Sequence, residues 1–142
     1  MKNFFIQGPI TPQFIADSIS KHQTKTSIGA HSIFLGQIRA DEKENSVVTA
    51  IEYTAHEEMA LLEMHKIREA TFQRFDITCM HVYHSLGKVN SGEICLFVFS
   101  SSQHRKECTA AIEHLVEQIK KKLPIFGKEI LEDNSHVWKE NN

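Results

Sequence analysis

The segment Ile94–Phe99 (ICLFVF) is apolar at every position, and it limits the possible folds more than any other part of the chain. A strand with one face in water alternates apolar and polar side chains, so an uninterrupted apolar run indicates a strand buried on both faces. The sequence therefore predicts a central strand at 93–100. The 142 residues suffice for a substantial core and show no linker-like or repeated segment, so we expect a single domain over residues 1–142.

Strands and helices are predicted on both sides of this run. A short strand at 3–7 ends at Gly8-Pro9, and Thr11-Pro12 predicts the start of a helix that continues to near Lys21. Further strands are expected at 27–39, 47–55 and 77–84, and a last amphipathic helix carries an apolar stripe from Cys108 to Leu123, followed by a turn and a tail with Trp138. A helix at 57–75 should turn Ala60, Leu61, Met64, Ile67, Phe72 and Phe75 inward.

The polar segment 40–46 (ADEKENS) is expected to form a hairpin loop or a mobile flap, with strands 27–39 and 47–55 paired antiparallel across it. A loop with Gly87 and Asn90-Ser91-Gly92 should join strands 77–84 and 93–100. The predicted class is α+β, a mainly antiparallel sheet with packed helices. A ferredoxin-like variant has the same order of elements and stays open on this pattern.

Composition excludes several classes of function. The net charge of −2 argues against a general nucleic-acid or membrane-surface binder. No apolar run approaches the roughly 20 residues that span a bilayer, and the N-terminus lacks a secretory signal, so a cytoplasmic location is expected. The three cysteines are expected to be buried small hydrophobes. His81 and His84 would point to opposite faces of one strand, so we predict no metal site and no cofactor.

Basic residues mark both ends of the last helix. His104 and Arg105 stand at its start, where free N–H groups and the helix dipole already favour anions. Lys120 lies beside the apolar stripe near its end, and a partly desolvated lysine can act as acid, base or nucleophile. Arg39 ends a strand after Gly36, and Lys128 follows Gly127 in a turn that could return toward Lys120.

The length of this helix separates its two basic ends. Arg105 and Lys120 are 15 positions apart, which corresponds to about 22 Å along an unbroken helix. One small ligand can hardly contact both residues of the same chain. If both belong to a site, we expect the site to be shared between two chains of a symmetric dimer, with two equivalent copies.

Five motifs occur in a fixed order: FLGQIRADE, IEYTAHEEMA, LGKVNSGE, SSSQHRKE and IKKKLPIFGKEI. Through the order and spacing of these motifs, the chain resembles the large, catalytic subunit of molybdopterin synthase from about Gly29 to Trp138. The resemblance implies an α/β hammerhead-like fold with extra β structure. It also implies a homodimer that binds a small ubiquitin-like subunit at each end, a heterotetramer. The thiocarboxylate on the small subunit's C-terminal Gly-Gly would supply sulfur, transferred twice to cyclic pyranopterin monophosphate to form the molybdopterin dithiolene, a step of molybdenum cofactor biosynthesis.

The resemblance also assigns roles to residues. The catalytic lysine falls on Lys120, and the substrate-binding arginine falls on Arg39, with Gln37 and Ile38 on the same edge. The pair His104-Arg105 would reach the site from the neighbouring subunit. The motif after the helix departs from the family pattern, because Gly127 stands where the family has a second lysine. We expect Lys128 to take the catalytic role of that lysine. The substrate-binding positions of this motif are Gly127, Lys128 and Glu129.

The chain departs from the family pattern at two other places, and its sequence is compatible with two other functions. The family's His-Arg-x-Gly reads His84-Ser85-Leu86-Gly87 here, and its basic C-terminal tail is short, with only Lys139 to replace it. Gly127 and the short tail also fit a non-catalytic adaptor that binds a ubiquitin-like Gly-Gly tail. The pattern alone is compatible with a small-molecule anion sensor of ferredoxin-like fold.

Overall fold

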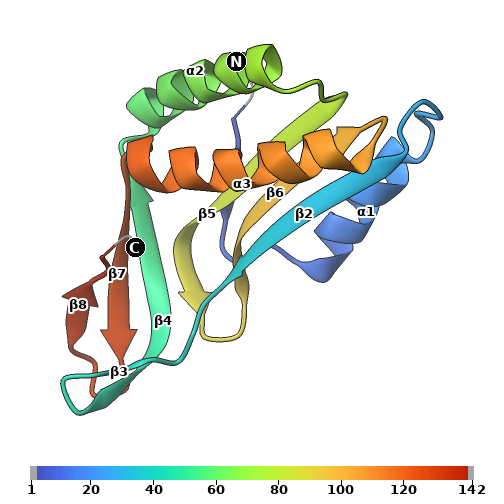
Figure 1. Cartoon of the computed structure of the whole chain (residues 1–142). Coiled ribbons are helices and arrows are strands. Elements are labelled where there is room, and N and C mark those ends of the chain that lie inside the picture. Colours follow the sequence, from blue (N-terminus) through green and yellow to red (C-terminus); the bar gives the residue numbers. More distant parts are fainter. Residues whose placement is uncertain (1–2, 141–142) are drawn as a thin grey trace.

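The computed structural model describes residues 3–140, which form three helices and eight strands (Figure 1). In chain order these are β1 (Phe5–Gln7), α1 (Pro12–His22), β2 (Ala30–Gln37), β3 (Glu42–Lys43), β4 (Ser46–Ala55), α2 (Glu57–Arg74), β5 (Cys79–Asn90), β6 (Ile94–Ser102), α3 (Arg105–Lys122), β7 (Ile125–Leu131) and β8 (His136–Trp138). Within residues 3–140, no helix is both long and apolar enough to cross a membrane.

The strands form a sheet in the order β2-β6-β5-β4-β7-β8, with β1 beside β5 and β3 beside β4. Every pairing is antiparallel except that of β1 with β5, which is parallel. The α+β class with a mainly antiparallel sheet is therefore confirmed. The apolar run is a central strand as predicted: β6 is paired with β2 on one side and with β5 on the other.

Helices cover both faces of this sheet, which explains why β6 has no polar face (Figure 1). Leu96 and Val98 point into the core beneath α2 and α3. Phe97 and Phe99, which alternate with them, pack with Ile15 of α1 on the opposite face. Thr11 caps α1 as the sequence predicts, since its hydroxyl accepts a hydrogen bond from the Phe14 N–H at 3.2 Å.

The predicted pairing of the strands at 27–39 and 47–55 is wrong. β2 pairs along its whole length with β6, and β4 pairs with β5 and β7. After an irregularity at Gly36/Gln37 the chain leaves the β2 edge, and the Ile38 N–H donates to the Glu93 carbonyl. The polar segment is a hairpin, but it joins the two-residue β3 to β4, with Glu44 and Asn45 at positive φ.

Three further segments differ from the expectation. Ile125–Leu131 is a strand, paired with β4, rather than a turn. The sequence did not reveal this strand because its partner is remote in the chain and because Pro124 and Gly127 obscure the alternation of buried residues. β5 runs on through Gly87, which takes φ 81°, so only Ser91 and Gly92 form the turn. On α2 the side chain of Phe72 is not turned inward as expected but is partly exposed, at 37%.

Candidate active site

A cavity of about 450 Å³ opens where the end of β2, the middle of β4, the last turn of α3 and β7 meet. It gathers six of the residues that the sequence singled out: Gln37, Ile38, Arg39, Lys120, Gly127 and Glu129. The remaining lining includes polar side chains that the sequence did not single out as site residues: Asp41, Lys43, Tyr53, His84, Cys95, Lys139 and Glu140.

Lys120 occupies the last turn of α3, next to the buried Ile119. Its side chain is half-buried, as its position beside the apolar stripe predicts. Burial lowers the pKa of Lys120, and the positive charge of Lys139 lowers it further, while Cys95 and Glu117 act in the opposite direction. Lys120 therefore releases its proton more readily than an ordinary lysine, which suits a group that donates and accepts protons.

Lys139 lines the cavity beside Gly127. A Cβ atom at position 127 would lie 3.0 Å from Ile51 Cγ2 and 3.2 Å from Tyr53 Cε1, so a larger side chain would have to displace its neighbours. The segment after β8 lies beside Gly127: the Lys139 N–H donates to the Gly127 carbonyl at 2.8 Å, and the Lys139 Cβ would be in ordinary contact with a Cβ at 127, at 3.5 Å. Lys139 thus supplies an ammonium group beside a position where the family has a lysine.

Lys128 does not take this place within one chain. Residues of β7 alternate across the sheet, so Gly127 and Glu129 face the cavity whereas Lys128 points to the other face. There its Nζ lies 3.4 Å from Glu52 Oε1. Within residues 3–140, the lining of the cavity does not include Lys128.

The hairpin of β3 and β4 is tied to the cavity by an ion pair. Lys43 Nζ donates to Glu129 Oε1 at 2.7 Å, and the side chain of Glu129 is almost fully buried, at 4% exposure. The hydrogen bond to Glu129 raises the pKa of Lys43 above its ordinary value. The polar segment predicted as a loop or flap therefore contributes side chains to the wall of the cavity.

Tyr53, His84 and Cys95 form a buried group in the same cavity. The Tyr53 and His84 rings meet edge to face at 4.9 Å, and the Tyr53 hydroxyl donates to Cys95 Sγ at 3.5 Å. Cys95 in turn donates to the Gly36 carbonyl at 3.4 Å. Tyr53 lies inside the motif IEYTAHEEMA, and His84 begins His84-Ser85-Leu86-Gly87, where the chain departs from the family pattern, so only the family resemblance drew attention to this region.

The two rings are uncharged at neutral pH. Burial lowers the pKa of His84 to about 4, and the charges of Lys120 and Lys139 also lower it. The Ser85 carbonyl, which accepts a hydrogen bond from His84 Nδ1 at 2.8 Å, acts in the opposite direction and raises this pKa. Burial raises the pKa of Tyr53, and the adjacent Cys95 adds to the effect. The cavity therefore has a neutral, buried floor of Tyr53 and His84 next to the cationic side chains of Lys120 and Lys139.

Arg39 lies at the rim. Its side chain is 80% exposed, and its Nη2 lies 3.2 Å from Asp41 Oδ2. An exposed ion pair of this kind contributes little to stability. The guanidinium can therefore exchange Asp41 for an anionic ligand at small cost.

His104 and Arg105 lie at the other end of α3 and are exposed. The helix has 18 residues, so its ends are separated by about 27 Å. The part of the chain that the structure describes does not bring either residue to the lining of this cavity. Their predicted role in the site thus requires a second copy of the chain.

Known proteins resemble this chain in sequence over most of its length. A family model described as MoaE protein matches residues 8–122, a span that includes Gln37, Arg39 and Lys120 but ends before Gly127 and Lys139. The molybdopterin synthase catalytic subunit of Pyrococcus abyssi is 34% identical over 119 residues, covering 84% of this chain and 79% of that protein. The catalytic subunit of Drosophila pseudoobscura pseudoobscura is 38% identical over 120 residues, and the alignment covers 82% of this chain but only 32% of that longer protein.

Solved structures share the whole fold. The crystal structure of molybdopterin synthase from Staphylococcus aureus superposes with a TM-score of 0.82 at 28% identity and covers 99% of this chain and 98% of that chain. A complex of subunits 1 and 2 of molybdopterin-converting factor from Helicobacter pylori gives a TM-score of 0.80 over 97% and 90% of the two chains, but at 19% identity it supports the fold alone. The fold that the resemblance implied is confirmed.

Proposed function

Because the chain belongs to the MoaE protein family and is the catalytic subunit of a molybdopterin synthase, we propose that the cavity beside Lys120 is its active site. The enzyme is a sulfurtransferase of molybdenum cofactor biosynthesis. The observation that carries the assignment of the site is the half-buried Lys120, whose pKa is lowered in a cavity that also holds Arg39 and Lys139. In this proposal the substrate is cyclic pyranopterin monophosphate, which carries a negatively charged cyclic phosphate.

The charges of the cavity favour an anion. Lys139 lowers the pKa of both Lys120 and His84, so these three groups lie within electrostatic reach of one another. A negative charge bound among them would relieve the repulsion between the two ammonium groups. Of the acidic residues in the lining, Glu129 pairs with Lys43 and Asp41 with Arg39, which leaves Lys120 and Lys139 against the single carboxylate of Glu140. An anionic ligand would therefore meet a surplus of positive charge.

Lys120 has the properties that the chemistry needs. Transfer of sulfur to the substrate with loss of water requires a group that first gives and later takes a proton. An ordinary surface lysine is protonated at neutral pH and is a poor base, whereas burial and the charge of Lys139 make Lys120 a better one. The neutral floor of Tyr53 and His84 excludes water from one side and keeps the electrostatic effect of the ammonium groups strong.

The sulfur donor in this proposal is a small ubiquitin-like subunit whose C-terminal Gly-Gly carries a thiocarboxylate. The Helicobacter pylori structure contains a complex of two subunits. Here the tail would enter the cavity over its rim and bring its sulfur to the substrate beside Lys120. We further propose that the enzyme is a homodimer in which His104 and Arg105 of one copy complete the cavity of the other, giving a heterotetramer with two small subunits.

The assignment of Lys120 is tested in a reconstituted reaction with thiocarboxylated small subunit and substrate. We expect Lys120→Ala to lower the rate of dithiolene formation by about 10²- to 10⁴-fold, the usual contribution of a positioned acid or base. Lys121→Ala is the matched control, because Lys121 is exposed on the same turn and pairs with Glu117. A Lys120→Ala enzyme that works at the wild-type rate would refute the role of Lys120.

The alternative of a non-catalytic adaptor makes a different prediction. The adaptor hypothesis was based on the glycine at position 127 and on the short tail. In the structure, Lys139 of that tail supplies an ammonium group beside Gly127, which weakens this argument. An adaptor would bind the small subunit but form no dithiolene in the same assay. Formation of product by the wild-type chain therefore removes this alternative.

A further inference from the structure

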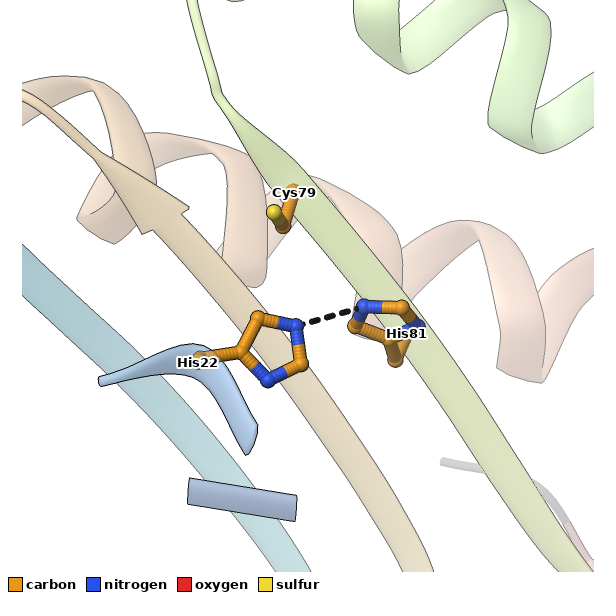
Figure 2. A group of neighbouring side chains, drawn as sticks. All are labelled: His22, Cys79 and His81. Atoms are coloured by element: carbon orange, nitrogen blue, oxygen red, sulfur yellow. Dashed lines mark hydrogen bonds between the residues drawn. The ribbon is translucent and has the colours of Figure 1, made fainter. Parts of the chain in front are cut away.

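A second group of reactive side chains lies on the opposite face of the sheet, under α1. His22 is the last residue of α1, and Cys79 and His81 are alternate residues of β5, so all three point into the same layer (Figure 2). We propose that His22, Cys79 and His81 form a binding site for Zn²⁺. Two imidazoles and a thiolate are ligands that zinc prefers, with water in the fourth position. This proposal is independent of the proposed active site.

The distances are close to those of a tetrahedral zinc site. The potential ligand atoms of the three residues all lie within 4.8 Å of one another, and the two Nε2 atoms are 2.8 Å apart. Bond lengths of about 2.0–2.1 Å to nitrogen and about 2.3 Å to sulfur place nitrogens about 3.3 Å apart and sulfur about 3.6 Å from each nitrogen. The nitrogens would separate by about 0.5 Å and the sulfur would approach by at most about 1.2 Å, which small side-chain rotations provide.

The orientation of His22 is already that of a metal ligand. Its Nδ1 donates to the Ser18 carbonyl at 2.7 Å, because a carbonyl can only accept. The other nitrogen, Nε2, therefore carries the lone pair in the neutral ring. Metal-bound histidines almost always hold their second nitrogen in this way, through a carboxylate or a backbone carbonyl.

The hydrogen bond between the imidazoles marks the position of the ion. Since His22 Nε2 accepts, His81 Nε2 is the donor, and a proton occupies the line between the two nitrogens (Figure 2). A zinc ion would replace that proton as the bridge between the two nitrogens, displaced from the line between them toward Cys79 so that both bonds reach about 2.0–2.1 Å. The His81 proton would move to Nδ1. The thiol of Cys79 would lose its proton to solvent when sulfur binds the ion, so one proton is released for each ion bound.

The residues are held in place by the core. His22 and Cys79 are buried, at 8% and 6% exposure. The ring of His22 packs at 4.7 Å on Phe99, a residue with no exposed surface, and at 4.7 Å on the ring of His81. Ligands fixed by packing lose little freedom when a metal binds, which favours affinity.

Lys25 is the feature that opposes a cation. Its Nζ donates to Cys79 Sγ at 3.0 Å and so occupies one side of the proposed site. Lys25 is exposed in the segment after α1, and its long side chain can turn into solvent when an ion arrives. Because two positive charges repel, we expect Lys25→Ala to bind zinc more tightly than the wild-type chain.

The site is tested by titrating the metal-free full-length chain with Co²⁺, a spectroscopic substitute for Zn²⁺. We expect one equivalent to give a sulfur-to-cobalt charge-transfer band and tetrahedral d–d absorption, both abolished by Zn²⁺. Cys79→Ser should remove the charge-transfer band. His22→Gln and His81→Gln should weaken binding by more than the roughly 10- to 100-fold that loss of an outer-shell partner costs. Absence of the band in the wild-type chain would overturn the proposal.

Matched controls separate this group from the other buried thiols and histidines. Cys108→Ser removes a buried thiol elsewhere, and His31→Gln removes a ring that also contacts Phe99, so neither should change the spectra. A band that survives in Cys79→Ser, or is lost in Cys108→Ser, would contradict the ligand set. If Cys79→Ser does not fold, alkylation of the wild-type chain decides: Zn²⁺ should slow labelling of Cys79 at least tenfold, and an unchanged rate would refute the site.

Discussion

Lys139 lies directly against Gly127: its N–H donates to the Gly127 carbonyl at 2.8 Å, and a Cβ at position 127 would come within 3.5 Å of the Lys139 Cβ. That approach is an ordinary van der Waals contact, and the tight contacts of a Cβ at position 127 would be with Ile51 and Tyr53. Lys139, in the tail after β8, thus brings an ammonium group to the cavity beside Gly127. We expect this ammonium group to serve in place of the lysine that the family pattern has at position 127.

The first prediction concerns this lysine. Lys139→Ala should raise the pKa of Lys120, because the charge of Lys139 lowers it. The variant should show a higher KM for the anionic substrate, and the limb of its pH–rate profile that reports Lys120 should move to higher pH. Lys128→Ala is the control, since Lys128 faces Glu52 on the other side of the sheet. A loss of activity in Lys128→Ala with none in Lys139→Ala would contradict this placement.

A second prediction concerns the ion pair of the hairpin. Lys43→Ala should leave the buried Glu129 carboxylate without its partner and lower the free energy of unfolding by about 1–3 kcal/mol. The double variant Lys43→Ala/Glu129→Gln should recover part of this loss, because it no longer buries an unpaired charge. Urea unfolding measures both. Equal stability of the wild type and Lys43→Ala at pH 7 would show that the pair contributes nothing.

The same pair has a pH dependence with a defined sign. Folding raises the pKa of Lys43, chiefly through its hydrogen bond to Glu129. The stability that the pair adds is therefore fully present below the pKa of the unfolded chain, about 10.4, and is lost as the pH rises through the higher folded value. The difference between the wild type and Lys43→Ala should persist at pH 7–9 and shrink at more alkaline pH.

The third prediction concerns acid stability. Burial lowers the pKa of His84 to about 4, whereas an unfolded histidine titrates near 6.5. Between these values the unfolded chain binds a proton that the folded chain does not, so stability falls as the pH falls from about 6.5 to 4, by about 3 kcal/mol in all. His84→Asn, which keeps a donor for the Ser85 carbonyl, should flatten this slope; His65→Asn on exposed α2 should not. An unchanged slope in His84→Asn would contradict the buried, neutral state.

Local patterns in the sequence predicted the parts of the site that depend on one element. The periodicity of α3 identified Lys120 as partly buried, and the unbroken apolar run identified β6 as a central strand. Both follow from side chains a few residues apart on one helix or strand. At the end of β2, the strand pattern marked Arg39 only as a candidate, and Gln37 was assigned through the family resemblance.

Contacts between remote segments could not be predicted in this way. The choice of β6 rather than β4 as the partner of β2 depends on packing across the sheet, which no window of the sequence contains. Lys139 reaches Gly127 only because β8 folds back on β7. The sequence indicated no metal site, because His81 and the nearby His84 point to opposite faces of one strand. The structure instead brings His81 into contact with His22, which is 59 positions away in the chain.

The last prediction concerns the second copy of the chain. If His104 and Arg105 complete the cavity of a partner, Arg105→Ala and Lys120→Ala chains are each inactive alone, but a heterodimer has one intact site and one that lacks both residues. Random exchange makes about half of the dimers mixed, so we expect about a quarter of the wild-type activity after mixing. Mixing Lys120→Ala with Lys139→Ala chains is the control: both residues line one cavity of one chain, so the mixed dimer has no intact site and the mixture should be no more active than the average of the two variants measured alone. Failure of the first mixture to recover, with exchange confirmed by mass spectrometry, would place the whole site within a single chain.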